Sequence, residues 1–504
     1  MGLILVAVTL SAVIGLYFRF NPLRHSTWFM FRRFINWFPL GLSYAFLYMG
    51  RNNLNVTQDA MTDLMPSKSF GTIFAAGAIV YAVSLVINGP VVDKIGGKKG
   101  IMIATVGAAI ANAMLGVATY QLMHGQLMLD MTLVFSVLYA VNMYFQSFGA
   151  VSIIKVKAYW FHVRERGVFG AIFGALISLG VYLAFDWGRA IVEASRVKVN
   201  GAPTFLQGTF QSLFHVWDGT KDAIWLAYFI PAGILLVFAL LDWWLICDTP
   251  EEAGLEDFDT HDASSGEMHL EFSIMDLLKR VFTSPILMLV GMVELTNGVV
   301  RNGIVNWYFP YLKQTGTAGA EFFHDNWGLL LFLGGISGGF AAGTISDKLF
   351  HSRRGPPVAL AGGSIILLLV VMAAILSASP VGVGLCAVLI GFFTIAIHSL
   401  MSGTAGADFG GRKATATAAG VTDGFVYLGA GIQSLALGQL TTISWQIWPL
   451  FLIPFSALGL FFASRMWKSL PEATKRYLLV VEKISITTES GHIESTVIEK
   501  ITTT

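Results

Sequence analysis

The chain consists of long apolar runs separated by short polar segments. Runs of about 20 apolar residues are long enough to cross a bilayer as α-helices. A transmembrane β-barrel would instead show alternating segments of about 10 residues, and such segments do not dominate this sequence. The pattern therefore predicts an all-α polytopic membrane protein. Its spans are predicted at residues 3–18, 35–57, 69–92, 100–120, 131–154, 168–186, 224–246, 286–309, 327–346, 357–377, 380–401, 417–440 and 445–466.

These spans form one added N-terminal helix followed by two sets of six. An acidic segment separates the sets, with ten acidic residues and no lysine or arginine between Asp248 and Asp276. Residues 272–282 have the pattern of an amphipathic surface helix. We expect the first span to be retained with its N-terminus outside; a cleaved or peripheral segment is the alternative. The predicted domains are 1–32 (extra helix and basic linker), 33–246 and 286–467 (six-helix bundles), 247–285 (acidic cytoplasmic linker) and 468–504 (cytoplasmic tail).

Composition and charge support this class and argue against several others. The chain is 55% hydrophobic and only 12% charged, about half the charge of a soluble protein. Its net charge of +1 argues against a nucleic-acid partner. Two cysteines, Cys247 and Cys386, offer neither a disulfide framework nor a metal-binding set. Lysine and arginine gather in the loops on one side of the spans, which predicts that those loops and the C-terminus are cytoplasmic.

A short turn motif occurs once in each half. Gly89 begins the sequence Gly-x-x-x-Asp-Lys that ends with Asp93 and Lys94, and the second copy ends with Asp347 and Lys348. One such turn is a weak signal, because glycine and charged residues are common between spans. Two copies at matching places indicate an internal duplication with pseudo-twofold symmetry.

Each half also carries one arginine inside an apolar run. Arg51 lies within residues 35–56 and Arg301 within residues 286–309. An arginine at the bilayer centre costs roughly 2.5–3.5 kcal/mol on insertion scales, so such residues usually face a polar cavity. Tyr44, Tyr48 and Arg51 follow helical spacing and share one face. One arginine per half predicts an anion site near the pseudo-twofold axis, although each arginine serving in a structural ion pair is the alternative.

The sequence from about residue 33 to 467 resembles the major facilitator superfamily, through the repeated turn and the two six-span halves. The segment 301–313 is similar to the seventh helix of organophosphate:phosphate antiporters. Further similar segments are 164–167, 418–420 and 427–429. The resemblance implies a major facilitator fold, with two six-helix bundles, in a bacterial-type inner membrane. By position, it assigns phosphate binding to Arg51 and Arg301, the cavity lining to Tyr44, Tyr48, Tyr81 and Tyr427, and cytoplasmic gating loops to Asp93, Lys94, Asp347 and Lys348.

The arginine pair makes physical sense as a phosphate site. A guanidinium group presents a rigid fork of donors that matches phosphate oxygens. A phosphate monoester carries about −1.5 to −2 charges at neutral pH, which two arginines roughly balance. Because neither half alone holds the anion tightly, binding favours closure of both halves. We therefore expect exchange of an organic phosphate ester, such as a glycerol or sugar phosphate, for inorganic phosphate by alternating access.

The sequence also departs from the antiporter family. Leu85, Asn52 and Ile177 stand where relatives carry cations, and residues 150–152 replace a Trp-Pro-Pro element. The site thus holds fewer cations than expected. Other polar residues lie inside spans and are candidates for ion coupling or for counter-ions, or for ordinary interhelical hydrogen bonds: Glu294, Asn297, His398 and Asp423.

Two other functions stay open. A proton-coupled carrier for another organic anion is favoured by Glu294 and the missing cations. A transport-deficient sensor of external sugar phosphate would use the same fold. The sequence has no ATP-binding loop, zinc pattern or nucleophile–base set, so we expect no enzyme activity, no cofactor and no metal. A monomer in the lipid bilayer is expected, with a small anion and inorganic phosphate as its ligands.

Overall fold

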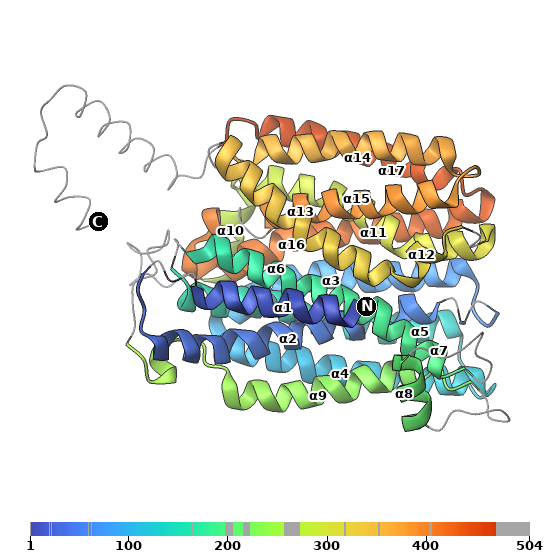
Figure 1. Ribbon diagram of the computed structural model, residues 1–504, viewed down its shortest axis with the longest axis horizontal. Coiled ribbons are helices and arrows are strands. Elements are labelled where there is room, and N and C mark those ends of the chain that lie inside the picture. The colour runs from blue at the N-terminus through green and yellow to red at the C-terminus, as the bar shows by residue number, and fades with distance from the viewer. Residues whose placement is uncertain are drawn as a thin grey trace, which may run out of the picture.

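A computed structural model shows a bundle of long helices that run side by side along one axis (Figure 1). The structure describes residues 2–19, 21, 23–58, 60–61, 63–162, 165–196, 205–214, 222–256, 273–316, 319–350, 353–402 and 406–469. All regular elements within these ranges are helices, as the hydrophobic pattern predicts. Each of the predicted spans coincides with a long helix, including the extra helix at the N-terminus.

The helices divide into a first and a second half. The first half contains α1 (Gly2–Arg19), α2 (Thr27–Thr57), α3 (Ser67–Ile95), α4 (Gly97–Met123), α5 (Met131–Trp160), α6 (Arg166–Tyr182), the π-helical turn η2 (Leu183–Trp187), α7 (Gly188–Ala194), α8 (Phe205–Phe214) and α9 (Leu226–Leu245). The connection holds η3 (Glu251–Ala253) and α10 (Ile274–Phe282). The second half contains α11 (Pro285–Thr315), α12 (Glu321–Asp325), α13 (Trp327–Leu349), α14 (Gly355–Ile375), α15 (Pro380–Leu400), α16 (Gly406–Ile443) and α17 (Ile447–Arg465).

Nine helices of the described chain are long and apolar enough to cross a membrane. Helix α1 is apolar but shorter, whereas α2, α11 and α16 do not reach that apolar composition, and these three carry Arg51, Arg301 and Asp423. The polar site residues thus lie in the helices whose composition departs most from a plain membrane span. The amphipathic segment predicted near residues 272–282 is the surface helix α10.

Local chemistry explains where several helices begin. Ser26, Asp130, Ser284 and Ser379 precede α2, α5, α11 and α15, and each side chain accepts a hydrogen bond from a backbone N–H of the first turn. Such caps satisfy donors that have no partner within the helix. Gly96, between α3 and α4, has φ of 91°. Glycine adopts a positive φ readily, so the chain reverses tightly just after the first copy of the motif. Both copies, residues 89–94 and 343–348, are themselves helical and lie near the ends of α3 and α13.

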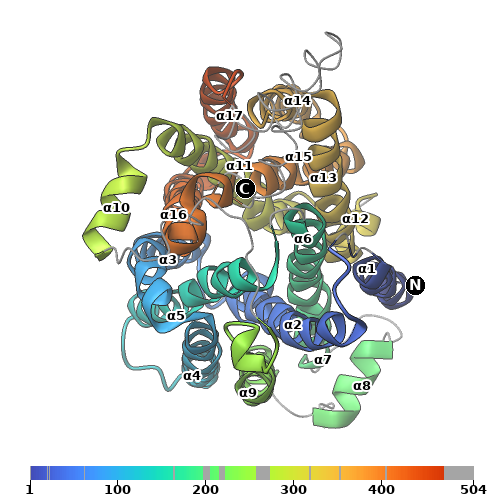
Figure 2. The same ribbon diagram turned by 90° about the vertical axis from the view of Figure 1, so that its left-hand side faces the viewer.

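The two halves meet along two seams (Figure 2), where α3 packs on α16 and α6 packs on α13. Along the first seam the backbones touch at both ends. A Cβ added to Gly89 would lie 2.7 Å from the carbonyl oxygen of Ala416, and one added to Gly71 would lie 2.9 Å from Cα of Gly438. Small residues permit this close approach of membrane helices. We call the end of the bundle that carries α10 the linker end, and the end that carries α12 the far end.

The extra helix α1 is fixed to the first half by a buried polar cluster. Tyr17 donates a hydrogen bond to the carbonyl of Met30 at 2.8 Å and accepts one from Nε of Arg33 at 3.1 Å. Both terminal nitrogens of Arg33 donate to the carboxylate of Glu165 at 2.9 Å. Burial would raise the pKa of Glu165, but hydrogen bonds from His25 and Arg33 outweigh it and lower that pKa to about 2.

Several helices extend beyond their predicted spans: α2 begins at Thr27 and not at residue 35, and α16 begins at Gly406 and not at residue 417. The sixth predicted span ends at residue 186, whereas the helical path continues through η2 and α7 to Ala194. Asp186 lies in η2, and its carboxylate accepts a hydrogen bond from the backbone N–H of Gly328 at 2.9 Å. This carboxylate satisfies a free donor in the first turn of α13, so a charged residue is retained within the helix instead of ending it.

Candidate functional site

Arg51 lies at the centre of the bundle and joins the two halves. One terminal nitrogen donates to the hydroxyl of Tyr427 on α16 at 2.6 Å, and the other donates to the hydroxyl of Tyr81 at 2.9 Å. Its guanidinium carbon lies 4.7 Å from the ring centres of Tyr48 and Tyr81. Only 4% of Arg51 is exposed. Its described hydrogen-bond partners are neutral, so the positive charge is held by hydroxyls and aromatic faces without a carboxylate.

The predicted tyrosines all belong to this cluster. Tyr44 packs edge-on against Tyr48 with ring centres 5.3 Å apart, and Tyr81 and Tyr427 lie 4.1 Å apart. Tyr427 comes from the second half, while the other three come from α2 and α3. The structure therefore brings together one arginine and four tyrosines that were selected from distant parts of the sequence.

A buried amide network lies behind Arg51. The side-chain oxygen of Gln146 accepts a hydrogen bond from Arg51 at 3.4 Å, and its nitrogen donates to Asn142 at 3.4 Å. Asn112 also donates to Asn142, at 3.1 Å, and accepts from Asn53. These residues connect α2, α4 and α5, so the network fixes the position of the Arg51 helix. Gln146 and Asn142 are four residues apart on one face of α5, but nothing in the sequence identifies their partners on α2 and α4.

Arg301 has very different surroundings. It is half-buried on α11, and its guanidinium donates no hydrogen bond to a described residue. It lies within electrostatic range of Tyr48 and Tyr427, both of which also contact Arg51. The two arginines therefore share two tyrosines.

A group of titratable residues lies beside Arg301 in the second half. Glu294 is fully buried, and each of its carboxylate oxygens lies 3.2 Å from Nδ1 of His398. Asn297 donates to Glu294 at 3.5 Å, and Ser402 donates to Asp423. Of the roles that the sequence left open for Glu294, the structure shows an interhelical contact, with the histidine of α15.

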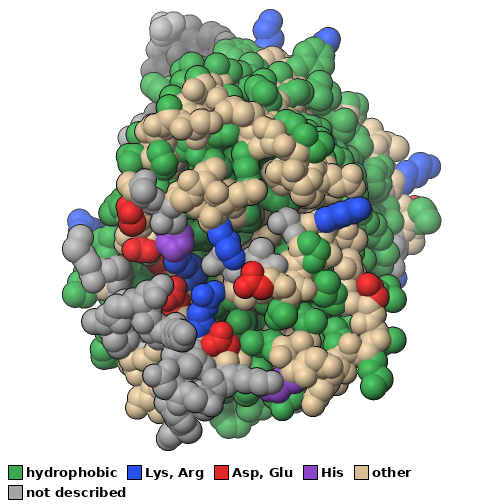
Figure 3. All heavy atoms as spheres, turned by 90° about the vertical axis from the view of Figure 1, so that its right-hand side faces the viewer, with side chains coloured by type: hydrophobic (Ala, Val, Ile, Leu, Met, Phe, Trp, Pro, Cys, Tyr) green, Lys and Arg blue, Asp and Glu red, His purple; other side chains and the backbone are tan. Residues whose placement is uncertain are grey.

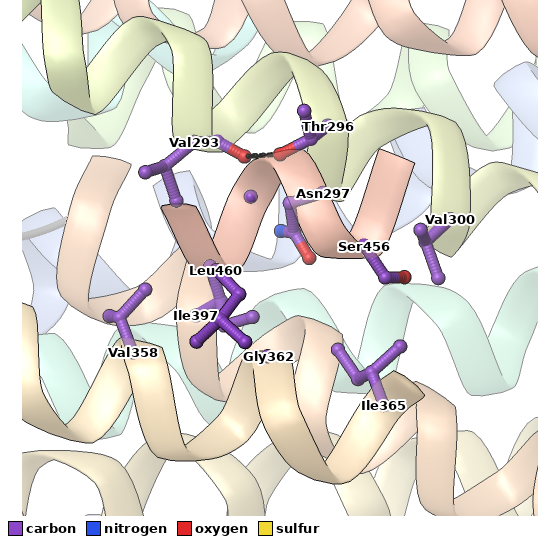
Figure 4. A pocket seen from close by; sticks show the side chains of 11 residues that line it. Val293, Thr296, Asn297, Val300, Val358, Gly362, Ile365, Ile397, Ser456 and Leu460 are labelled. Carbon is purple, nitrogen blue, oxygen red and sulfur yellow. Dashed lines mark hydrogen bonds between the residues drawn. The ribbon is translucent and has the colours of Figure 1, made fainter. Parts of the chain in front are cut away.

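A small cavity of about 20 Å³ lies in the second half, between α11, α14, α15 and α17 (Figure 4). Most of its lining is apolar, for example Val358, Ile365 and Leu460. The side-chain oxygens of Asn297 and Ser456 are buried at this cavity and have no hydrogen-bond partner among the described residues. Because none of the arginine–tyrosine residues lines it, this cavity is separate from the central cluster.

At the linker end, Asp93 connects the two halves. Its carboxylate pairs with Nζ of Lys155 on α5 at 2.9 Å. It also accepts hydrogen bonds from the backbone N–H of Thr417 at 3.2 Å and from its hydroxyl at 2.9 Å, both on α16. Lys94 is exposed. The backbone of residues 347 and 348 belongs to α13, but the side chains of Asp347 and Lys348 lie outside the described part of the structure.

At the far end, other side chains connect the halves. Arg189 on α7 donates to the carbonyl oxygen of His324 on α12, and its guanidinium lies 4.0 Å from the carboxylate of Asp325. Positive, negative and histidine side chains gather on this face of the molecule (Figure 3). The role of Arg189 could not be found from the sequence, because no spacing rule links it to a residue 135 positions away.

Comparison with known proteins identifies the fold family. Residues 40–434 match the family model of the Major Facilitator Superfamily. The chain belongs to the major facilitator superfamily. Among solved structures, a bacterial homolog of the human lysosomal transporter Spinster has a similar fold, with a TM-score of 0.62 at 12% identity, covering 88% of this chain and 98% of that one.

Curated relatives of this superfamily member confirm the resemblance to the organophosphate:phosphate antiporter family. The membrane sensor protein UhpC of Escherichia coli is 26% identical, over 80% of this chain and 85% of the relative. The glycerol-3-phosphate transporter of Bacillus subtilis is 24% identical, over 85% and 90%. A probable hexose phosphate transport protein of Chlamydia trachomatis is 23% identical, over 80% and 84%.

Proposed function

We propose that this chain exchanges an organic phosphate ester for inorganic phosphate, with Arg51 and Arg301 binding the phosphate group. The observation that carries the proposal is the arrangement of the arginines, one in each half, around the shared residues Tyr48 and Tyr427. Phosphate oxygens accept the same hydrogen bonds that Tyr81 and Tyr427 now accept from Arg51. Relatives named as glycerol phosphate and hexose phosphate transporters support an ester of that kind.

Alternating access follows from the contacts between the halves. Asp93 and Thr417 link them at the linker end, while Arg189 and His324 link them at the far end. In the proposed cycle each set breaks in turn, and the bound anion holds the central arginines together. Without the anion the two positive charges disfavour that arrangement, so the loaded carrier reorients and the empty one does not. The expected result is obligate exchange, driven by the two solute gradients.

The proposed placement is an inner, plasma-type membrane, with the linker end and the C-terminus in the cytoplasm, as the distribution of lysine and arginine predicts. Residues 33–246 and 286–467 are proposed as the two moving bundles of a monomer. Residues 257–272 of the acidic linker and residues 470–504 of the tail lie outside the described structure. The roles proposed for them rest on the sequence alone.

The test is uptake of radiolabelled phosphate into proteoliposomes that contain the purified protein. Vesicles preloaded with phosphate are expected to take up label, and empty vesicles are not. Glycerol 3-phosphate and glucose 6-phosphate are then added outside as competitors, and the inhibiting ester identifies the substrate. Equal uptake into loaded and empty vesicles would contradict exchange.

A second candidate function is sensing without transport, because one relative is named a membrane sensor protein. The same arginine site would then bind the ester without completing the cycle. Binding of glycerol 3-phosphate or glucose 6-phosphate to the purified protein, with no exchange in either kind of vesicle, would favour the sensor over the transporter.

Replacing Asp93 with asparagine is expected to lower the exchange rate about tenfold while leaving phosphate binding nearly unchanged. The amide oxygen still accepts a hydrogen bond from Thr417. The ammonium of Lys155 loses its counter-ion, although only 7% of the Lys155 side chain is exposed. The state closed at the linker end is therefore less populated. Exchange and phosphate affinity are measured side by side, with Asp63→Asn, at an exposed acid, as the control. Equal exchange rates for the two variants would rule out the gating role.

A further inference from the structure

The charges around the proposed site are unequally divided between the halves. Arg51 contributes a positive charge from the first half, and its described hydrogen-bond partners are neutral. In the second half, Arg301 lies near Asp423 and near the pair formed by Glu294 and His398. Two arginines alone balance the charge of a phosphate dianion. Binding therefore does not need these acids, and their presence must have another explanation.

Glu294 and His398 form a pair suited to holding an exchangeable proton. The carboxylate is fully buried, and both of its oxygens lie 3.2 Å from the same imidazole nitrogen. A buried carboxylate without a partner is costly, so the pair holds at least one proton and is then neutral overall. The imidazole is 24% exposed, which gives protons a route from water to the buried acid.

Asp423 is less suited to this role. Burial disfavours its ionised form, but the hydroxyl of Ser402 donates a hydrogen bond to its carboxylate, and His398 and Arg301 lie nearby, all of which favour that form. The charged groups that interact with His398 are Glu294, Arg301 and Asp423. The other charged side chains described on the helices packed against α11, α15 and α16 lie towards helix ends: Lys68, Asp93, Lys94, Lys155, Lys157, Asp276, Lys279, Lys313, Glu321, His324, Asp325 and Arg465.

Charge balance then determines what happens when a ligand binds. With both arginines and Asp423 ionised and the Glu294–His398 pair neutral, the site carries one net positive charge. A bound phosphate dianion makes the closed site net negative, which is unfavourable in a medium of low dielectric constant. Uptake of one proton by the pair restores neutrality, because it then contains a neutral carboxyl group and an imidazolium.

We propose that the Glu294–His398 pair takes up a proton whenever a phosphate dianion binds between Arg51 and Arg301. This inference rests on the proposed function, because it requires that the arginines bind phosphate. By thermodynamic linkage, a proton that is taken up on binding also tightens binding, so affinity for the dianion rises as pH falls. The transported species is then the anion together with a proton.

The experiment is titration calorimetry of the purified protein with glycerol 3-phosphate at pH 8, where the ester is a dianion. Repeating it in buffers with different heats of ionisation gives the number of protons taken up. The expected value is about one proton per bound ester, and well below half a proton for the Glu294→Gln/His398→Gln double variant, whose pair is permanently neutral. The matched control is Asp242→Asn, a buried acid of α9, which packs on α2 and α4.

The outcomes separate the two proposals. Absence of binding for both glycerol 3-phosphate and inorganic phosphate would contradict the proposed function itself. Binding without proton uptake would overturn the inference and leave the phosphate site intact, as would undiminished uptake in the double variant. If the double variant does not fold, His398→Gln alone replaces it. Its remaining acid is expected to be protonated before binding, so uptake should again be lost.

Discussion

Arg51→Lys is expected to lower phosphate exchange by about 100-fold or more, which corresponds to roughly 2.7 kcal/mol. Lysine keeps the charge but not the fork of donors that reaches Tyr81 and Tyr427 at the same time. A single ammonium group also loses the stacking of the guanidinium over Tyr48. Initial exchange rates in phosphate-loaded proteoliposomes measure the effect.

The matched control for this substitution is Arg465→Lys at the end of α17, outside the arginine–tyrosine cluster. It is expected to exchange at the wild-type rate. Arg301→Lys is expected to behave like Arg51→Lys, although Arg301 donates no hydrogen bond to a described residue. A rate within about threefold of wild type for either site variant would refute bidentate phosphate binding by that arginine.

Glu165→Ala is expected to cause the largest loss of stability, about 3–5 kcal/mol. The substitution leaves the guanidinium of Arg33 without a counter-ion, although only 1% of Arg33 is exposed. It also weakens the attachment of α1, because the same guanidinium holds the hydroxyl of Tyr17. Thermal unfolding in detergent measures the change, with Glu256→Ala, at an exposed acid, as the control. A midpoint equal to that of the control would show that the ion pair is not needed.

The pH dependence of this difference follows from the pKa of Glu165. That pKa is lowered from 4.5 in the free side chain to about 2, by His25 and Arg33 against the effect of burial. The stabilisation is therefore complete above the unfolded pKa and is lost as pH falls from about 4.5 through about 2. The difference between wild type and Glu165→Ala should stay constant from pH 8 to about pH 5. Disappearance of the difference already at pH 6 would contradict the assignment to Glu165.

The helices were predictable because a membrane span has a simple physical requirement, about 20 apolar residues. Every predicted run therefore coincides with a helix, and the tight turn after the first copy of the motif was predicted as well. The end of the sixth span was not predictable, because Asp186 is stabilised by Gly328 of another helix, 142 residues later. A charged residue marks a helix end only when no distant partner satisfies it.

The central site was partly predictable for the same reason. Arg51 inside an apolar run requires polar partners, and helical spacing identified Tyr48 on its own face. The resemblance to a known family supplied Tyr81 and Tyr427. The pairing of Glu294 with His398 was not predictable, because it depends on how α11 packs on α15 over a separation of 104 residues. Spacing within one helix carries no information about such a contact.

The most direct test of the phosphate site is a double-mutant cycle on phosphate affinity. Dissociation constants are measured for wild type, Arg51→Lys, Arg301→Lys and the double variant. If both arginines bind one phosphate, the loss in the double variant should be at least about tenfold smaller than the product of the single losses, because either substitution alone already disrupts the shared site. Losses that multiply fully would mean that the two arginines act independently, and would contradict a single site between the halves.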